Sequence, residues 1–113
     1  MDIVKAAFVE ATKRSDRLGF DVMEVHSAHG YLLHEFLSPI ANTRNDEYGG
    51  SIDNRMRYPL EVFMAIREIW PESKPMGLRL STTDWTDNGW STEESVIYAE
   101  KLKALGCDYI CAS

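Results

Sequence analysis

Two histidines and a tyrosine lie close together at the start of the stretch "HSAHGYLLHEFLSP", which runs from His26 to Pro39. Two imidazole N–H groups from His26 and His29 that converge on one oxygen would polarise a carbonyl. The phenol of Tyr31 can donate a proton to the adjacent carbon. Core histidines that only make structural hydrogen bonds explain His26 and His29, taken singly, at least as well. The stretch therefore predicts either a carbonyl-binding, proton-donating site or a pair of structural histidines.

A metal site is the other chemistry that these residue types suggest, but the spacing argues against it. After His34 and Glu35, the zinc motif HExxH needs a second histidine where Ser38 stands, and no cysteine is nearby. The segment "DWTDNGWSTEES" resembles a calcium loop that begins at Asp84. Its twelfth position is Ser95, where the bidentate glutamate belongs. The sequence predicts no metal site.

The hydrophobic pattern predicts helices and strands that alternate along the chain. Helices are expected over residues 3–18, 52–70 and 91–106, and strands over 20–26, 74–81 and 107–113. Pro59 should kink or restart the second helix, because proline donates no amide proton. The order α-β-α-β-α-β predicts neighbouring parallel strands with right-handed crossovers. Both a doubly wound sheet and part of an eight-stranded (β/α) barrel fit this order.

Polar residues follow the predicted strands, where either architecture gathers its chemistry. His26, Arg79 and Ser113 lie at the three strand ends. Arg79 shares its strand face with Gly77, so a permanent cation is expected to point where His26 points. The alternative is a structural ion pair between Arg79 and Glu24.

Composition limits the classes of partner and the compartment. The 113 residues carry a formal net charge of -6, which argues against binding nucleic acid. No apolar run is long enough to span a bilayer, and no signal-peptide cleavage pattern occurs near the start. Cys107 and Cys111 match no redox or zinc motif, so two small residues in a reducing compartment are expected. We expect a cytoplasmic protein without membrane contacts.

The order of the residues also resembles that of a known family. The run "EVHSAHGYLLHEFLSPIANTRNDEYGGSIDNRMRYPLEV" closely resembles the region around the fourth strand of the Old Yellow Enzyme family of FMN-dependent ene-reductases. "GLRLSTTDW" is similar to the family's fifth strand and "GCDYICAS" to its sixth. The resemblance implies an α/β fold, a partial (β/α)8 TIM barrel of about strands 4 to 6. Residues 1–113 would be the central part of a single FMN-binding domain.

The resemblance also implies a role for each candidate residue. His26 and His29 would bind the substrate's carbonyl oxygen, and His29 points to the His/His branch rather than the His/Asn branch. Tyr31 would be the proton donor. Arg79 would lie beside the flavin pyrimidine edge, and His26 would also contact the cofactor. The implied enzyme uses NAD(P)H to reduce FMN and then reduces the C=C bond of a small activated alkene, with a homo-oligomer as its possible assembly.

Other polar residues are expected to stabilise the barrel rim rather than to take part in catalysis. Ion pairs and caps are expected to hold the long loop at residues 38–50, which is rich in proline, asparagine, aspartate and glycine. His34 and Glu35 are expected in the same support layer. The loop supports are expected to be Arg44, Asp46, Glu47, Arg55 and Arg57.

The resemblance covers three strands of the eight that close a barrel. The family's FMN phosphate site and its other flavin contacts lie on the remaining strands, so the 113 residues alone are expected to be unstable or to associate, and to be inactive. One alternative is the dienoyl-CoA reductase and trimethylamine dehydrogenase group, which has similar sequence motifs and adds an iron-sulfur cluster. The other is a non-catalytic barrel fragment or assembly module.

Overall fold

The computed structural model describes every residue from Met1 to Ser113 and confirms the predicted alternation of helices and strands. One element was not expected from the sequence: a short helix formed by the second half of the histidine stretch. The elements are α1 (Asp2–Arg17), β1 (Met23–Ser27), α2 (Leu32–Leu37), α3 (Ile52–Ile69), β2 (Met76–Leu80), α4 (Thr92–Ala104) and β3 (Tyr109–Ala112).

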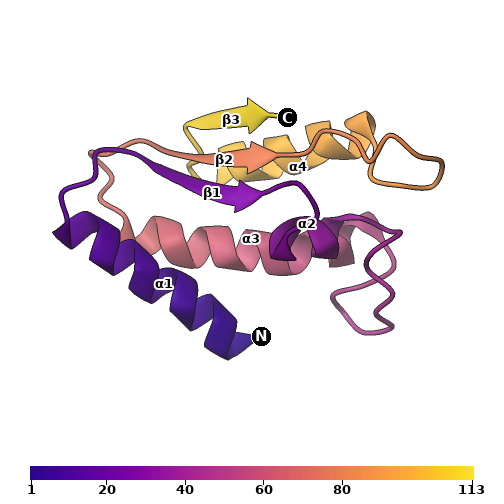
Figure 1. Cartoon of the computed structure of the whole chain (residues 1–113), viewed down its shortest axis with the longest axis horizontal. Coiled ribbons are helices and arrows are strands. Elements are labelled where there is room, and N and C mark those ends of the chain that lie inside the picture. Colours follow the sequence, from indigo (N-terminus) through magenta and orange to yellow (C-terminus); the bar gives the residue numbers. More distant parts are fainter.

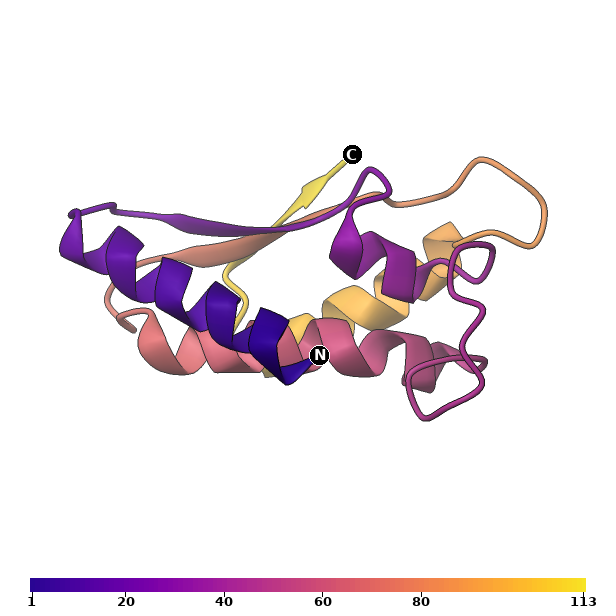
Figure 2. The same cartoon turned by 60° about the horizontal axis from the view of Figure 1, so that its bottom comes forward.

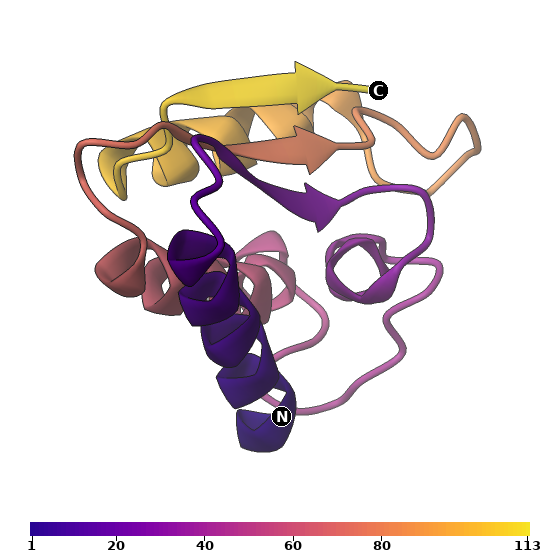
Figure 3. The same ribbon diagram turned by 60° about the vertical axis from the view of Figure 1, so that its left-hand side comes forward.

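The three strands form one parallel sheet in the order β1-β2-β3. Figures 1 and 3 show all four helices on one face of this sheet, while the other face carries no covering element. The register pairs His26 with Arg79, and Arg79 with Cys111. Side chains of paired residues leave a parallel sheet on the same side. The sheet thus has one helix-covered face and one open face, and His26 and Arg79 belong to the open one.

The core lies between the sheet and the helices. Met76, Leu78 and Leu80 are fully buried on the helix-covered face of β2, as their alternation predicted. Phe63 and Ile66 of α3 pack against them in the same cluster. None of the four helices combines the length and the hydrophobicity that crossing a lipid bilayer requires.

Helix α4 begins and ends where its sequence predicted. The hydroxyl of Ser91 accepts the N–H of Glu94, and the Glu94 carboxylate accepts the N–H of Ser91, which makes a complete capping box. Gly106 follows the helix with a φ of 87°, a left-handed conformation in which glycine carries no steric penalty.

Helix α3 is continuous from Ile52 to Ile69, so of the predicted kink or restart at Pro59 the restart is wrong. A proline inside a helix costs about 3 kcal/mol, chiefly through a lost hydrogen bond and a steric clash. Here Pro59 is buried, and Met56, Val62 and Phe63 around it are fully buried in the core. We attribute the continuity of the helix to this burial, which stabilises its two halves together.

Figure 2 shows the backbone of the long loop before α3. The predicted arginines largely hold this loop in place. Arg55 is only 5% exposed and donates to the carbonyls of Leu37 and Gly50 and to the carboxylate of Glu94. Arg57 donates to the carbonyl of Glu47, so Glu47 contributes its backbone rather than its charge. The remaining expected support is an ion pair between Arg44 and Asp46.

Candidate active site

The turn after β1 has an unusual backbone, with His29 at a φ of 60° and Gly30 at 74°. The left-handed region costs a residue with a Cβ roughly 1 kcal/mol, so His29 needs support from its surroundings. The His29 N–H donates to the hydroxyl of Ser81, 2.9 Å away, and the Gly30 N–H donates to Nδ1 of His34 at 2.8 Å. The Tyr31 N–H donates to the carbonyl of Ala28. Three successive backbone donors are therefore satisfied.

This turn brings together the three rings that the sequence singled out. The ring centroids of His26 and His29 lie 5.2 Å apart with the planes at 66°, and those of His26 and Tyr31 also lie 5.2 Å apart. All three side chains are exposed, Tyr31 to 64%. The predicted cluster is present, but it forms an open wall rather than the lining of a single cavity.

His29 is held in an environment that favours its neutral form. Desolvation lowers the pKa of its imidazole, and the positive charge of Arg79 lowers it further. Its Nε2 lies 2.7 Å from the hydroxyl of Ser113, which follows β3. A neutral imidazole can hold an oxygen through one N–H without releasing its proton. His29 is thus suited to binding rather than to acid catalysis.

Arg79 is the cation nearest to this wall on the neighbouring strand. It forms no ion pair, so the alternative of a salt bridge with Glu24 is wrong. Its Nε is buried without a hydrogen-bond partner. A buried donor without a partner costs about 1–3 kcal/mol, which a ligand with acceptor atoms would relieve. The polar edge of a flavin pyrimidine is such a ligand, and Arg79 therefore fits the cofactor that the sequence implied.

A tyrosine covers the open face of the sheet below Arg79. A Cβ added to Gly77 would meet the ring of Tyr109 at 2.4 Å, so the ring lies directly over this glycine. Burial raises the pKa of the Tyr109 phenol, and the carboxylate of Glu24 raises it further. Glu24 therefore faces Tyr109 across Gly77 and does not neutralise Arg79.

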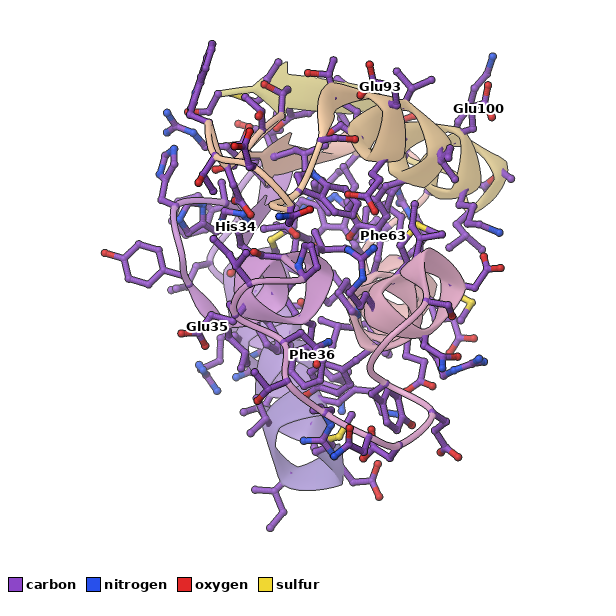
Figure 4. The ribbon with its side chains drawn as sticks, turned by 90° about the vertical axis from the view of Figure 1, so that its right-hand side faces the viewer. His34, Glu35, Phe36, Phe63, Glu93 and Glu100 are labelled. Atoms are coloured by element: carbon purple, nitrogen blue, oxygen red, sulfur yellow. The ribbon has the colours of Figure 1, made fainter.

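The sequence did not reveal a network that joins His34 to the loop after β2. Nε2 of His34 lies 2.8 Å from the Asp84 carboxylate, which also accepts the hydroxyl of Ser38 and the N–H of Trp90. Burial raises the pKa of Asp84, but the interactions with Ser38, Trp90 and His34 together outweigh it and leave the pKa below its ordinary value. In Figure 4, Glu35 points outward from the helix that carries His34, and it is exposed. The only sequence signals were two separate motifs, a zinc-like one at His34 and a calcium-like one at Asp84.

Comparison with known proteins finds relatives along almost the whole chain. The model of the NADH:flavin oxidoreductase / NADH oxidase family matches residues 2–113. An NADH:flavin oxidoreductase of Gibberella zeae is 44% identical over 120 residues, which cover 97% of this chain and 29% of the relative. An NADPH dehydrogenase of Bacillus subtilis is 44% identical over 107 residues, 94% of this chain and 31% of the relative. The chain thus spans about three tenths of the length of these curated relatives.

Solved structures of reductases also superpose closely on the fold of this chain. A complex of 2-naphthoyl-CoA reductase with 2-naphthoyl-CoA superposes with a TM-score of 0.89 at 29% identity, over 99% of this chain and 17% of that one. Morphinone reductase in complex with tetrahydroNAD superposes with a TM-score of 0.83 at 34% identity, over 95% of this chain and 30% of that one. The predicted fold, a segment of a (β/α)8 barrel, is confirmed. The chain belongs to the NADH:flavin oxidoreductase / NADH oxidase family, as its resemblance to the Old Yellow Enzymes predicted.

Proposed function

We propose that residues 1–113 are the central part of a single FMN-binding barrel domain whose complete chain uses NAD(P)H to reduce activated alkenes. The observation that carries this proposal is the wall of His26, His29 and Tyr31 beside the unpaired Arg79. An α,β-unsaturated carbonyl compound offers the two features that such a wall can use. Its oxygen accepts hydrogen bonds, and its α-carbon accepts a proton.

His26 and His29 bind the carbonyl oxygen in this proposal. Their ring centroids lie 5.2 Å apart with the planes at 66°, so two N–H groups can approach one oxygen from different sides. The lowered pKa of His29 keeps its imidazole neutral at pH 7, which leaves it a hydrogen-bond donor without making it a strong acid. The hydroxyl of Ser113 lies 2.7 Å from Nε2 of His29. When the substrate binds through this nitrogen, its oxygen would replace the Ser113 hydroxyl as the hydrogen-bond partner or share the nitrogen with it.

Tyr31 delivers the proton to the α-carbon. Its ring centroid lies 5.2 Å from that of His26, so the phenol is close to a substrate whose oxygen is bound by the histidines. The bound FMN, once reduced by NAD(P)H, would supply the hydride for the β-carbon. Tyr31 is the remaining donor of the wall, because both histidines are assigned to the oxygen.

Arg79 and His26 hold the flavin side of the site. The guanidinium of Arg79 carries a permanent charge, and its buried Nε lacks a partner. Placed beside the pyrimidine edge, this charge would stabilise negative charge on the reduced cofactor. His26 is the register partner of Arg79, so it is the member of the wall that lies next to this cation.

A second candidate is a reductase that acts on an acyl-CoA thioester. The superposition on 2-naphthoyl-CoA reductase, with a TM-score of 0.89, favours it. A thioester also presents a carbonyl oxygen that two imidazoles can polarise. The iron-sulfur group of relatives predicted as an alternative from the sequence belongs with this candidate. The cytoplasmic location and the homo-oligomer also stay predictions.

Stopped-flow measurements on the FMN-loaded complete protein separate these candidates. Reduction of the flavin by NADPH is followed first, and its reoxidation by cyclohex-2-enone or by 2-naphthoyl-CoA second. Rapid reoxidation by the enone supports the first candidate, and reoxidation by the thioester alone supports the second. A complete protein that binds no FMN would contradict both and favour a non-catalytic barrel module. The 113-residue chain, purified by itself, is expected to bind no stoichiometric FMN.

A further inference from the structure

His34 lies in α2, outside the wall of His26, His29 and Tyr31, yet both of its ring nitrogens are engaged. Nδ1 accepts the Gly30 N–H at 2.8 Å, and Nε2 lies 2.8 Å from the Asp84 carboxylate. A backbone N–H can only donate, so Nδ1 carries no proton in this arrangement. Nε2 must then carry the proton and donate it to the carboxylate. The geometry therefore fixes one tautomer of the ring.

The partner of this ring, Asp84, is itself held firmly. Its side chain is only 7% exposed, and its second oxygen accepts the hydroxyl of Ser38 at 2.6 Å and the N–H of Trp90 at 2.7 Å. The Asp84 N–H donates to the carbonyl of Trp90, which ties the carboxylate to the loop between β2 and α4. Buried carboxylates with several donors have a fixed orientation, because each lost bond leaves charge unsatisfied. If the His34 ring turned, the buried Asp84 carboxylate would lose one of its hydrogen-bond donors.

The backbone that His34 holds is the one that presents the substrate wall. Gly30 stands between His29 and Tyr31, and both His29 and Gly30 have left-handed φ angles. Without an acceptor for the Gly30 N–H, the turn loses one of the bonds that offset its unfavourable backbone. A relaxed turn would move His29 on one side and Tyr31 on the other. Figure 4 shows His34 on the short helix that follows this turn.

We propose that His34 is a positioning residue that fixes the separation between the oxygen-binding His29 and the proton donor Tyr31. This inference rests on the proposed function for its catalytic consequence, but its structural core does not depend on it. The role belongs to the Nδ1 acceptor, whereas Nε2 anchors the ring to Asp84. The two nitrogens therefore have separable tasks.

Two substitutions separate these tasks in the FMN-loaded complete protein. The amide oxygen of His34→Asn can stand near Nδ1, so this variant keeps an acceptor for Gly30 and loses the donor to Asp84. The amide nitrogen of His34→Gln can stand near Nε2, so this variant keeps the donor and loses the acceptor. For His34→Gln we expect the KM for cyclohex-2-enone to rise about tenfold, with the rate of flavin reduction by NADPH unchanged. For His34→Asn we expect a wild-type KM and a lower melting temperature. A wild-type KM in His34→Gln, or equal KM increases in both variants, would overturn the proposal.

Nuclear magnetic resonance tests the structural core without any turnover. In the wild-type complete protein with labelled histidine, His34 should show a protonated Nε2 and an unprotonated Nδ1. The Gly30 amide should exchange with solvent about tenfold faster in His34→Gln than in His34→Asn. A protonated Nδ1, or equal exchange in the two variants, contradicts the positioning role even if the enone is a good substrate. If the enone is not reduced but these spectra are as expected, the proposed function fails and the positioning of the turn stands.

Discussion

His26 on β1 and Arg79 on β2 are direct register partners in the parallel sheet, and their side chains therefore leave the same face at the same level. The helices cover the other face (Figure 1). On the open face Arg79 forms no ion pair with a carboxylate, and its Nε has no hydrogen-bond partner. This pairing places an unneutralised cation beside the imidazole that begins the substrate wall. It is the relationship from which the proposed flavin and substrate sites follow.

Replacing Tyr31 with phenylalanine should slow the reoxidation of reduced flavin by cyclohex-2-enone about a hundredfold or more, because general acid catalysis contributes roughly that much. Reduction of the flavin by NADPH should keep its wild-type rate, since Tyr31 takes no part in it. Stopped-flow absorbance measures both steps. Tyr48→Phe is the matched control, because Tyr48 lies in the loop before α3 and contacts Glu61. Equal slowing of both half-reactions by Tyr31→Phe would refute the proton-donor assignment.

Arg79→Gln should weaken FMN binding by the complete protein about tenfold or more, because a charge-assisted hydrogen bond contributes about 1.5–3 kcal/mol. Titration of the apoprotein with FMN, followed by fluorescence quenching, gives the dissociation constant. Arg17→Gln removes an equal charge from the exposed end of α1 and should leave FMN affinity unchanged. If both variants lose affinity equally, net charge rather than a contact of Arg79 explains the effect.

Asp84→Asn should destabilise the complete protein by about 2 kcal/mol at pH 7, since the amide cannot accept all the donors that the carboxylate holds. The folded state lowers the pKa of Asp84 below its ordinary value, so the contribution of the charge is present above that value and is lost as the pH falls through the folded pKa. The difference between variant and wild type in urea unfolding should therefore shrink below about pH 4. Asp87→Asn, an exposed substitution in the same loop, should show no such difference. A gap for Asp84→Asn that stays constant with pH would contradict the role of the charge.

Gly77→Ala should destabilise the complete protein by about 1–3 kcal/mol, because the added Cβ would meet the ring of Tyr109 at 2.4 Å. The ring must shift, and with it the contact to Glu24. Tyr109→Ala removes the obstacle, so Gly77→Ala made in that background should cost much less. A double-mutant cycle from denaturant unfolding measures this coupling. Additive effects would show that the ring does not restrict Gly77.

Local features of the sequence were enough to predict much of the fold. The helical and strand periods predicted α1, α3, α4 and the three strands, because each depends on which neighbours in the chain share a face. The spacing of His26, His29 and Tyr31 predicted their cluster, since all three lie in or beside one turn. A restart at Pro59 does not occur, because burial of α3 in the core, which local rules do not weigh, keeps the helix continuous.

By itself, then, the sequence determined the alternating elements, the family and the short run of residues that we propose to bind a carbonyl and deliver a proton. Only the tertiary structure decided which polar groups meet across the chain. Arg79 could have paired with Glu24, but the ring of Tyr109 lies over Gly77 and faces Glu24, so the cation stays free. His34 meets Asp84 although 50 positions separate them. Such contacts depend on how strands and loops are brought together, and no local spacing in the chain specifies them.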